Sequence, residues 1–229
     1  MRLTYTAVLM FILIIIISFI GSAIVRAWLQ RTYKQWSQVP NQVGANGHAV
    51  ARHILDSNDL HHVRLEVSQG ALSDHYIPSQ DLMRLSTDIN NQPSVASIAV
   101  AAHECGHALQ DKESYGWLKF KAVMMPFAAI GNKAGLMMAI GAGAIGSTLI
   151  MNLGLLLMLL GMLMPILTLP IEFDASKRAL EQLSTLELVT DAEYAGAKSV
   201  LRAAAFTYVA GAASSMAILG LLAFRMLRR

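Results

Sequence analysis

The segment His103-Glu104-Cys105-Gly106-His107 has the residue types and the spacing of a zinc site built on one helix. Residues four apart lie on the same face of an α-helix, with Cβ atoms about 5–6 Å apart, so both imidazoles can reach one ion. Glu104 stands one position round the helix, where its carboxylate can take a proton from a water whose pKa zinc lowers towards about 7. The pattern predicts His103 and His107 as Zn²⁺ ligands and Glu104 as the general base of a hydrolase.

The alternative interpretation of this pattern is a pair of structural histidines with an incidental glutamate. The neighbouring residues argue against it, because Ala99–Ala102 and Ala108 make the helix apolar and two histidines buried there without partners would be costly. Gly106 costs the helix about 1 kcal/mol relative to alanine. A glycine at that position therefore indicates that another group approaches the helix closely.

A catalytic zinc usually has three protein ligands, with water in the fourth position. If two membrane spans follow His107, the chain returns to its starting side near Pro170, where the first acids are Glu172 and Asp174. Either acid could instead favour the dipole of a helix that begins there. The spacing thus predicts a third ligand at Glu172 or Asp174 and leaves the choice open. Cys105 is two positions from each histidine and faces elsewhere.

The composition is that of a membrane protein. Of the 229 residues, 55% are hydrophobic and 14% are charged, whereas soluble chains average about 25% charged residues. The net charge of +3 comes from basic residues scattered along the chain, which argues against nucleic-acid binding. The single cysteine excludes an intramolecular disulfide.

Long uncharged runs predict the membrane spans. Ala7–Val25 has 19 residues without a charge, close to the length of about 20 that crosses a bilayer. A cleaved signal peptide is the rival interpretation, but the apolar run continues past the small residues Gly21–Ala23. Ala134–Leu169, with 36 uncharged residues, is too long for one straight span and predicts a hairpin that turns near Gly143–Asn152. Ala203–Phe224 is a further uncharged run of 22 residues.

Local patterns predict the remaining elements. Ser94 is a predicted N-cap, since its hydroxyl can accept from backbone N–H groups of the first helical turn. Gly131 and Gly135 have the spacing of close helix packing in lipid, and a loop or hinge is an equally good interpretation. The patterns predict helices over Gly47–Leu55 and Val95–Gln110, a strand over Val63–Val67, an extended segment over Tyr76–Leu85, and a helix over Ile171–Lys198 broken near Glu187–Asp191.

Several blocks of the chain resemble the YugP-like family of neutral zinc metallopeptidases found in bacterial membranes. They are Leu72–Pro78, Leu85-Ser86, Val100–Gln110, Leu169–Ser176 and Ala203–Ala210, and their order and spacing are similar over nearly the whole chain. The family is similar in layout to HtpX-type membrane proteases, whose third ligand is the glutamate of an E-x-x-x-D helix motif.

The resemblance implies that Glu172 is the third zinc ligand. The fourth residue after it is Ser176 rather than aspartate, so the partner that orients a ligand histidine would be Asp174 or Ser176. His75, in one of the matching blocks, is interpreted as structural. Tyr208, in another, is interpreted as an anchor at the membrane interface.

We therefore predict a mostly α-helical membrane protein with about four transmembrane helices and a small α+β, zincin-like catalytic unit outside the membrane. The predicted parts are an N-terminal transmembrane anchor (1–28), an extramembrane α+β part with the HExxH helix (29–120), a transmembrane hairpin (121–170), a helical segment with the third ligand (171–202), and a C-terminal transmembrane helix with a basic tail (203–229).

The predicted function is zinc-dependent endopeptidase activity on peptide or membrane-protein substrates, in contact with the lipid bilayer. The alternative is a non-catalytic zinc-binding sensor or scaffold. The expected location is the bacterial inner membrane, with several spans. Basic residues near the predicted spans favour a cytoplasmic active site. Seven flank the side of the site (Arg26, Arg31, Lys34, Lys119, Lys121, Lys177 and Arg178) and four flank the other side (Arg2, Arg225, Arg228 and Arg229).

Overall fold

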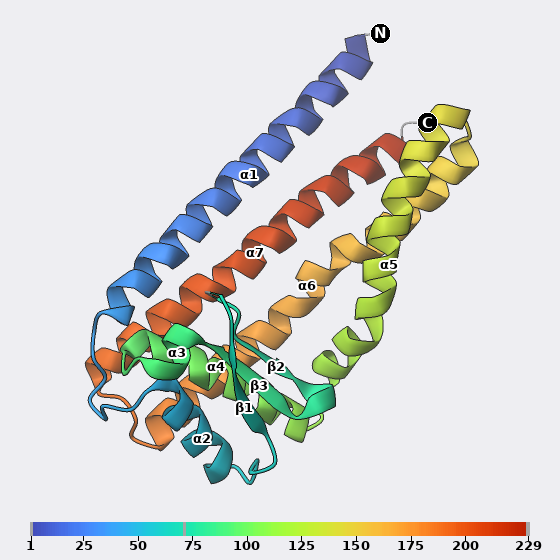
Figure 1. The fold of residues 1–229 in the computed structure, drawn as a ribbon. Coiled ribbons are helices and arrows are strands. Elements are labelled where there is room, and N and C mark those ends of the chain that lie inside the picture. Colours follow the sequence, from blue (N-terminus) through green and yellow to red (C-terminus); the bar gives the residue numbers. More distant parts are fainter. Residues whose placement is uncertain (1, 71, 228–229) are drawn as a thin grey trace. The chain divides into compact units, whose positions relative to one another are not determined.

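The computed structural model describes residues 2–70 and 72–227, which are mostly helical with one three-stranded sheet (Figure 1). The chain divides into two compact units. The apolar helical unit comprises Met1–Val25, Gly116–Pro170 and Thr207–Arg229, and the α+β unit comprises Arg26–Tyr115 and Ile171–Phe206.

The α+β unit contains the sheet, in the order β1-β3-β2. Strand β1 (Arg64–Ser68) runs parallel to β3 (Leu82–Ser86), and β2 (His75–Ile77) pairs antiparallel with β3. The predicted strand near Val63–Val67 is confirmed. The single extended segment expected over Tyr76–Leu85 is wrong. Pro78 fixes a φ suited to a tight turn, and the 3-10 helix η1 (Pro78–Gln80) separates two strands there.

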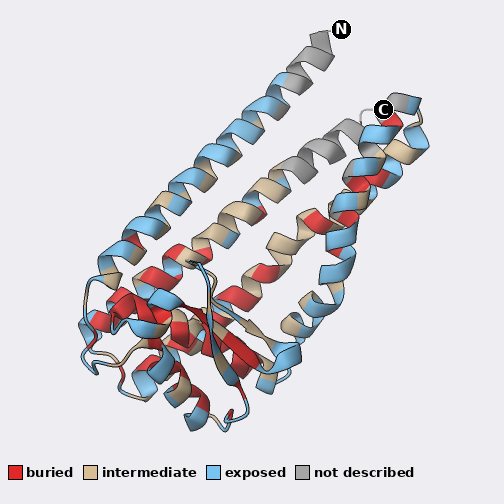
Figure 2. Ribbon diagram, in the orientation of Figure 1, coloured by how far each residue is buried: buried red, intermediate tan, exposed pale blue. Residues whose placement is uncertain are grey.

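Besides the end of α1 (Arg2–Ser37), the α+β unit contains three α-helices before Gly116: α2 (Gly47–Ser57), α3 (Thr87–Asn91) and α4 (Val95–Lys112). Helix α4 has the predicted N-cap, Ser94, whose hydroxyl accepts from the Ser97 backbone N–H. The apolar faces of α2 and α4 share one core with β3, and buried residues are concentrated in these elements (Figure 2). Apolar burial of this kind supplies most of the free energy that holds α4 in place.

The only cysteine of the chain is part of this core. Cys105 has no exposed surface, and its Sγ donates to the Ala51 carbonyl oxygen at 3.6 Å. Burial raises the pKa of the Cys105 thiol, so the reactive thiolate is scarce. We expect N-ethylmaleimide to leave the folded protein unmodified at pH 8 and to add one label after denaturation, as measured by intact mass. Labelling of the folded protein at the denatured rate would contradict this packing of α4 against α2.

Three described helices are long and apolar enough to cross a membrane. These stretches are Ile12–Ser37 within α1 (Arg2–Ser37), Gly116–Ala142 within α5 (Gly116–Ile145), and α6 (Thr148–Thr185). The fourth predicted span, 203–224, is part of α7 (Asp191–Leu227) and is not among these three. Four spans stay a prediction.

Helices α5 and α6 form the predicted hairpin within the apolar helical unit. Their turn falls at Gly146, in the interval predicted from the sequence, and Gly146 has φ +68°, a conformation that favours glycine. A Cβ atom added at Gly131 would lie 2.6 Å from the Leu157 carbonyl oxygen, and one at Gly135 would lie 2.6 Å from that of Gly154. The two glycines therefore allow close packing of α5 and α6, which is the interpretation given above beside that of a loop or hinge.

Helix α6 continues without a break to Thr185. The sequence predicted a separate helix start at Ile171, and this prediction is wrong. Pro170 is accommodated inside α6, as prolines in membrane helices often are. Glu172 and Asp174 are therefore far from a helix N-terminus, and the helix dipole does not explain them. The predicted break near Glu187–Asp191 is confirmed, since α7 begins at Asp191.

Candidate metal centre

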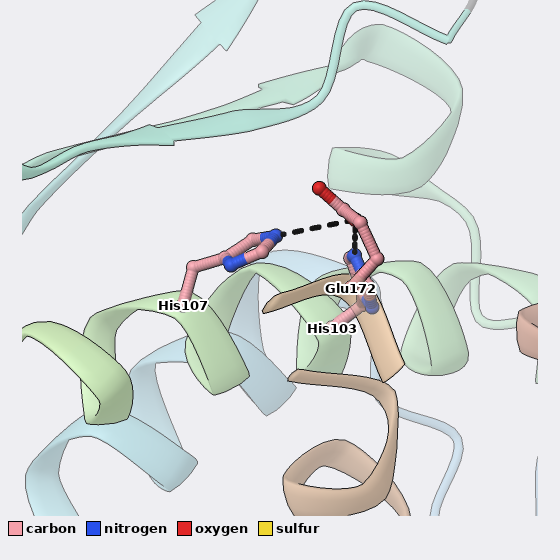
Figure 3. Close-up of side chains that lie close together, drawn as sticks. All are labelled: His103, His107 and Glu172. Atoms are coloured by element: carbon pink, nitrogen blue, oxygen red, sulfur yellow. Dashed lines mark hydrogen bonds and ion pairs between the residues drawn. The ribbon is translucent and has the colours of Figure 1, made fainter. Parts of the chain in front are cut away.

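His103, His107 and Glu172 form a compact cluster in the α+β unit. Helix α4 presents both imidazoles on one face, and α6 brings in the carboxylate from a distant part of the chain. The Oε2 atom of Glu172 is 3.3 Å from His103 Nε2 and 3.6 Å from His107 Nε2. Figure 3 shows both rings directed at the same carboxylate. Within the described residues, the structure thus unites the histidine pair with Glu172 rather than with Asp174.

The geometry of the cluster fits a zinc ion. Two nitrogens and one carboxylate oxygen are the donors of a catalytic zinc site with an open fourth position. Ligand atoms at zinc distances and tetrahedral angles are about 3.3 Å apart, and the donor atoms of the cluster lie within 4.8 Å of one another. Only small side-chain movements are needed to bring all three onto one ion.

The close contact between α4 and α6 depends on Gly106. A Cβ atom added at this residue would collide with the carbonyl oxygen of Ala175 on α6. The absence of a side chain on α4 lets the backbone of α6 come near enough for Glu172 to reach the histidines. The prediction from the sequence that Gly106 makes room for a close approach is confirmed, and the approaching group is a neighbouring helix.

Gln110 fixes the orientation of the His107 ring. Its Nε2 donates to the Ile171 carbonyl oxygen and to Asp174 Oδ2, both at 2.8 Å. Because its amide nitrogen already donates to two acceptors, the Oε1 atom faces His107 Nδ1 at 3.0 Å and accepts a hydrogen bond from it. His107 Nε2 is then left with a free lone pair directed at the cluster.

Ser176 contacts the other histidine. Its Oγ is 3.2 Å from His103 Nδ1, on the side of the ring opposite the cluster. Asp174 and Ser176 were the two residues predicted as alternatives for orienting a ligand histidine, and each of them is connected to a different ring. Ser176 contacts His103 directly, and Asp174 acts on His107 through Gln110. Arg178 Nε in turn donates to Asp174 at 2.6 Å.

Sequence reasoning missed Gln110. A detectable signal existed, because Gln110 is three residues after His107 and such pairs lie on one helix face. The sequence did not show that α6 would supply two acceptors that fix the direction of its amide.

Glu104 is buried beside the cluster. Burial raises the pKa of its carboxyl, while the charges of His103 and His107 act in the opposite direction. It is not one of the three residues whose donor atoms converge. The structure thus places a buried carboxylate next to the cluster but outside the group of three donors.

Residues 10–228 match the protein family described as "Putative neutral zinc metallopeptidase". The chain belongs to this family. It is also 36% identical, over 188 residues, to "Putative membrane protease YugP" of Bacillus subtilis (strain 168), a match that covers 82% of this chain and 84% of that protein. No solved structure matches the chain. In this member of the zinc metallopeptidase family, the cluster built by α4 and α6 is the group of described residues that could hold a metal.

The other residues singled out from the sequence stay outside the cluster. His75 is exposed on β2, where its Nδ1 donates to the Ser73 carbonyl oxygen at 2.7 Å, in keeping with a structural role. Tyr208 belongs to the apolar helical unit. Cys105 points into the core of this family member and away from the metal centre.

Replacing Gln110 with leucine is expected to weaken zinc binding by about 10–100-fold, because partners that orient metal ligands typically contribute this much. The change keeps the approximate side-chain volume but removes the acceptor for His107 Nδ1. Zinc affinity can be measured by competition with a chromophoric chelator. Gln182→Leu is the matched control, since Gln182 lies on α6 and its Oε1 accepts from Asn58 rather than from a histidine. Equal zinc affinities in wild type and Gln110→Leu would contradict the orienting role.

Proposed function

We propose that this protein is a membrane-embedded, zinc-dependent endopeptidase, with His103, His107 and Glu172 as ligands and Glu104 as catalytic base. The observation that carries the proposal is the convergence of Glu172 on the two histidines of a helix that also holds the buried Glu104. Membership of the zinc metallopeptidase family supports it.

Zinc, when bound, polarises the scissile carbonyl and lowers the pKa of a water. The protein supplies the proton transfers. Glu104 accepts a proton from the attacking water and later delivers it to the leaving amine, so that one carboxyl serves as base and then as acid. Burial makes Glu104 a stronger base than an exposed glutamate, because it raises the pKa of the carboxyl. The Gln110 side-chain oxygen keeps His107 in the tautomer that carries its proton on Nδ1, and the Ser176 hydroxyl holds the ring of His103 in place.

We further propose a bacterial inner-membrane location with several spans and with the site on the cytoplasmic side. The three apolar helices and the name of the Bacillus relative support the membrane location. The excess of basic residues near the span ends on the side of the site supports the orientation. Peptides or membrane proteins exposed on that side are the proposed substrates.

The proposal is tested by removing and restoring the metal. The full chain purified in detergent is expected to contain about one zinc and to cleave casein or a fluorogenic peptide library. A chelator such as 1,10-phenanthroline should abolish cleavage, and added Zn²⁺ should restore it. A chain that binds no zinc would refute the metal centre. A chain that binds zinc but cleaves neither substrate would favour the scaffold or sensor alternative.

A further inference from the structure

An open groove of about 430 Å³ lies between α6 and α7 in the α+β unit. Its apolar lining includes Phe173 and Leu180 from α6 and Leu201 and Ala205 from α7. Phe173 exposes half of its surface, so a large apolar side chain faces outwards at one end of the groove. We refer to it as the α6–α7 groove.

The polar lining of the α6–α7 groove is cationic. It contains Lys177, Lys198 and Arg202 but one acid, Glu181, for a net charge of +2. Lys177 pairs with Glu181 at 3.6 Å, whereas neither Lys198 nor Arg202 has an acidic partner among the residues that the structure describes. Among the described residues, these two cations thus border an apolar surface without an ion-pair partner, which is complementary to an anionic amphiphile.

The cations stand at the depth of lipid headgroups if α6 and α7 cross a bilayer. Phe173 is four residues after Leu169, where the long uncharged run ends, and Lys177 follows one helical turn later. These steps are about 6 Å each along a helix, comparable to the headgroup layer on one side of a bilayer. On α7, Arg202 directly precedes the uncharged run that begins at Ala203, and Lys198 is one turn before it.

Aromatic side chains lie beside Arg202, at the level proposed for the lipid headgroups. The Arg202 guanidinium lies 5.7 Å over the ring of Phe206, and Trp28 packs edge-on against Phe206 with ring centroids 5.3 Å apart. Trp28 follows the uncharged run of α1 by three residues. Tryptophans beside such runs are typical of the boundary between lipid and water, so Arg202 is held at that boundary.

The α6–α7 groove is not the substrate cleft of the metal centre. Ser176 lines the groove, and its Oγ contacts His103 on Nδ1. The other ring nitrogen, Nε2, faces Glu172 and the metal position. The groove therefore lies behind His103, on the side of the ring that does not face the reacting atoms.

We propose that the α6–α7 groove binds one anionic phospholipid, with its phosphate between Lys198 and Arg202 and its acyl chains along Phe173, Leu201 and Ala205. This inference rests on the membrane embedding proposed above and not on peptidase activity. A basic groove with an apolar floor selects a headgroup that carries net negative charge over a zwitterionic one.

The test measures lipid binding to the zinc-loaded full chain in detergent. Fluorescent phosphatidylglycerol and phosphatidylcholine are titrated separately, and phosphatidylglycerol is expected to bind at least about tenfold more tightly. Each basic residue near a headgroup contributes about fivefold in affinity. Lys198→Gln combined with Arg202→Gln should therefore weaken phosphatidylglycerol binding by about 25-fold. The control is Arg64→Gln combined with Arg84→Gln on β1 and β3, which removes the same charge outside the groove and should change binding less than about twofold.

Three results would overturn the proposal: equal affinity for the two lipids, an unchanged affinity in the groove variant, or an equal loss in the control variant. An equal loss in the control variant would mean that the lipid is attracted by the overall charge of the protein and not by the groove. Zinc content and cleavage, measured in the same preparations, separate the two proposals. Zinc retained in the groove variant shows that it is folded. Selective lipid binding without cleavage would support this inference and count against the proposed peptidase activity. Zinc-dependent cleavage without selective lipid binding would support the peptidase activity and refute this inference.

Discussion

Replacing Glu104 with glutamine is expected to leave about one zinc per chain and to lower peptide cleavage by about 10²–10⁴-fold or more. Glutamine has nearly the shape of glutamate but cannot accept a proton at neutral pH. The three converging donors are His103, His107 and Glu172, so the metal should stay bound. Zinc content by atomic absorption and initial cleavage rates, measured on the same sample, give the comparison.

Glu66→Gln is the matched control, because it makes the same chemical change on the exposed strand β1, where Glu66 accepts from Arg84. Its zinc content and cleavage rate should stay within about twofold of wild type. Full cleavage activity in Glu104→Gln would refute the proposed mechanism. Loss of zinc in Glu104→Gln would instead show that this residue takes part in holding the ion.

Replacing Gly106 with alanine is expected to destabilise the protein by about 1–3 kcal/mol and to weaken zinc binding at least tenfold. The added methyl group has two opposite effects on the stability of the protein. Alanine favours an isolated helix by about 1 kcal/mol, but at this position its Cβ would collide with the backbone carbonyl of Ala175. A carbonyl in the middle of α6 cannot rotate away, so α4 and α6 must separate and Glu172 must move from the histidines. The collision therefore outweighs the gain in helix propensity.

Thermal unfolding and zinc titration check this expectation, with Gly141→Ala as control. Gly141 is also inside a helix, α5, but a Cβ atom there would meet nothing within 4 Å. That variant should be neutral or slightly stabilised. An unchanged zinc affinity in Gly106→Ala would show that the two helices do not need their close contact.

Much of the candidate site follows from local sequence. His103 and His107 share a helix face because the helical period is 3.6 residues, and Ser94 starts that helix because its hydroxyl satisfies an N–H of the first turn. The apolar runs and the turn at Gly146 are likewise local, since span length and the preference for positive φ depend on few neighbouring residues. Each of these features can be evaluated without knowing what packs against it.

The rest depended on contacts between distant segments. Glu172 and Asp174 are equivalent by spacing, and the structure distinguishes them because α6 continues through Pro170 and directs Glu172 at the histidines while Asp174 accepts from Gln110. The division of the predicted extended segment into β2 and β3, and the parallel pairing of β3 with β1, are also non-local.

The physical reason is that local periodicity determines which face of an element a side chain occupies, whereas the partner of that face is chosen by packing. Gly106 illustrates both levels. As a residue type inside a helix it is unfavourable, which the sequence alone reveals. The packing of α4 against α6 adds what the sequence does not show. The missing side chain makes room for the Ala175 carbonyl, and Glu172 therefore reaches His103 and His107.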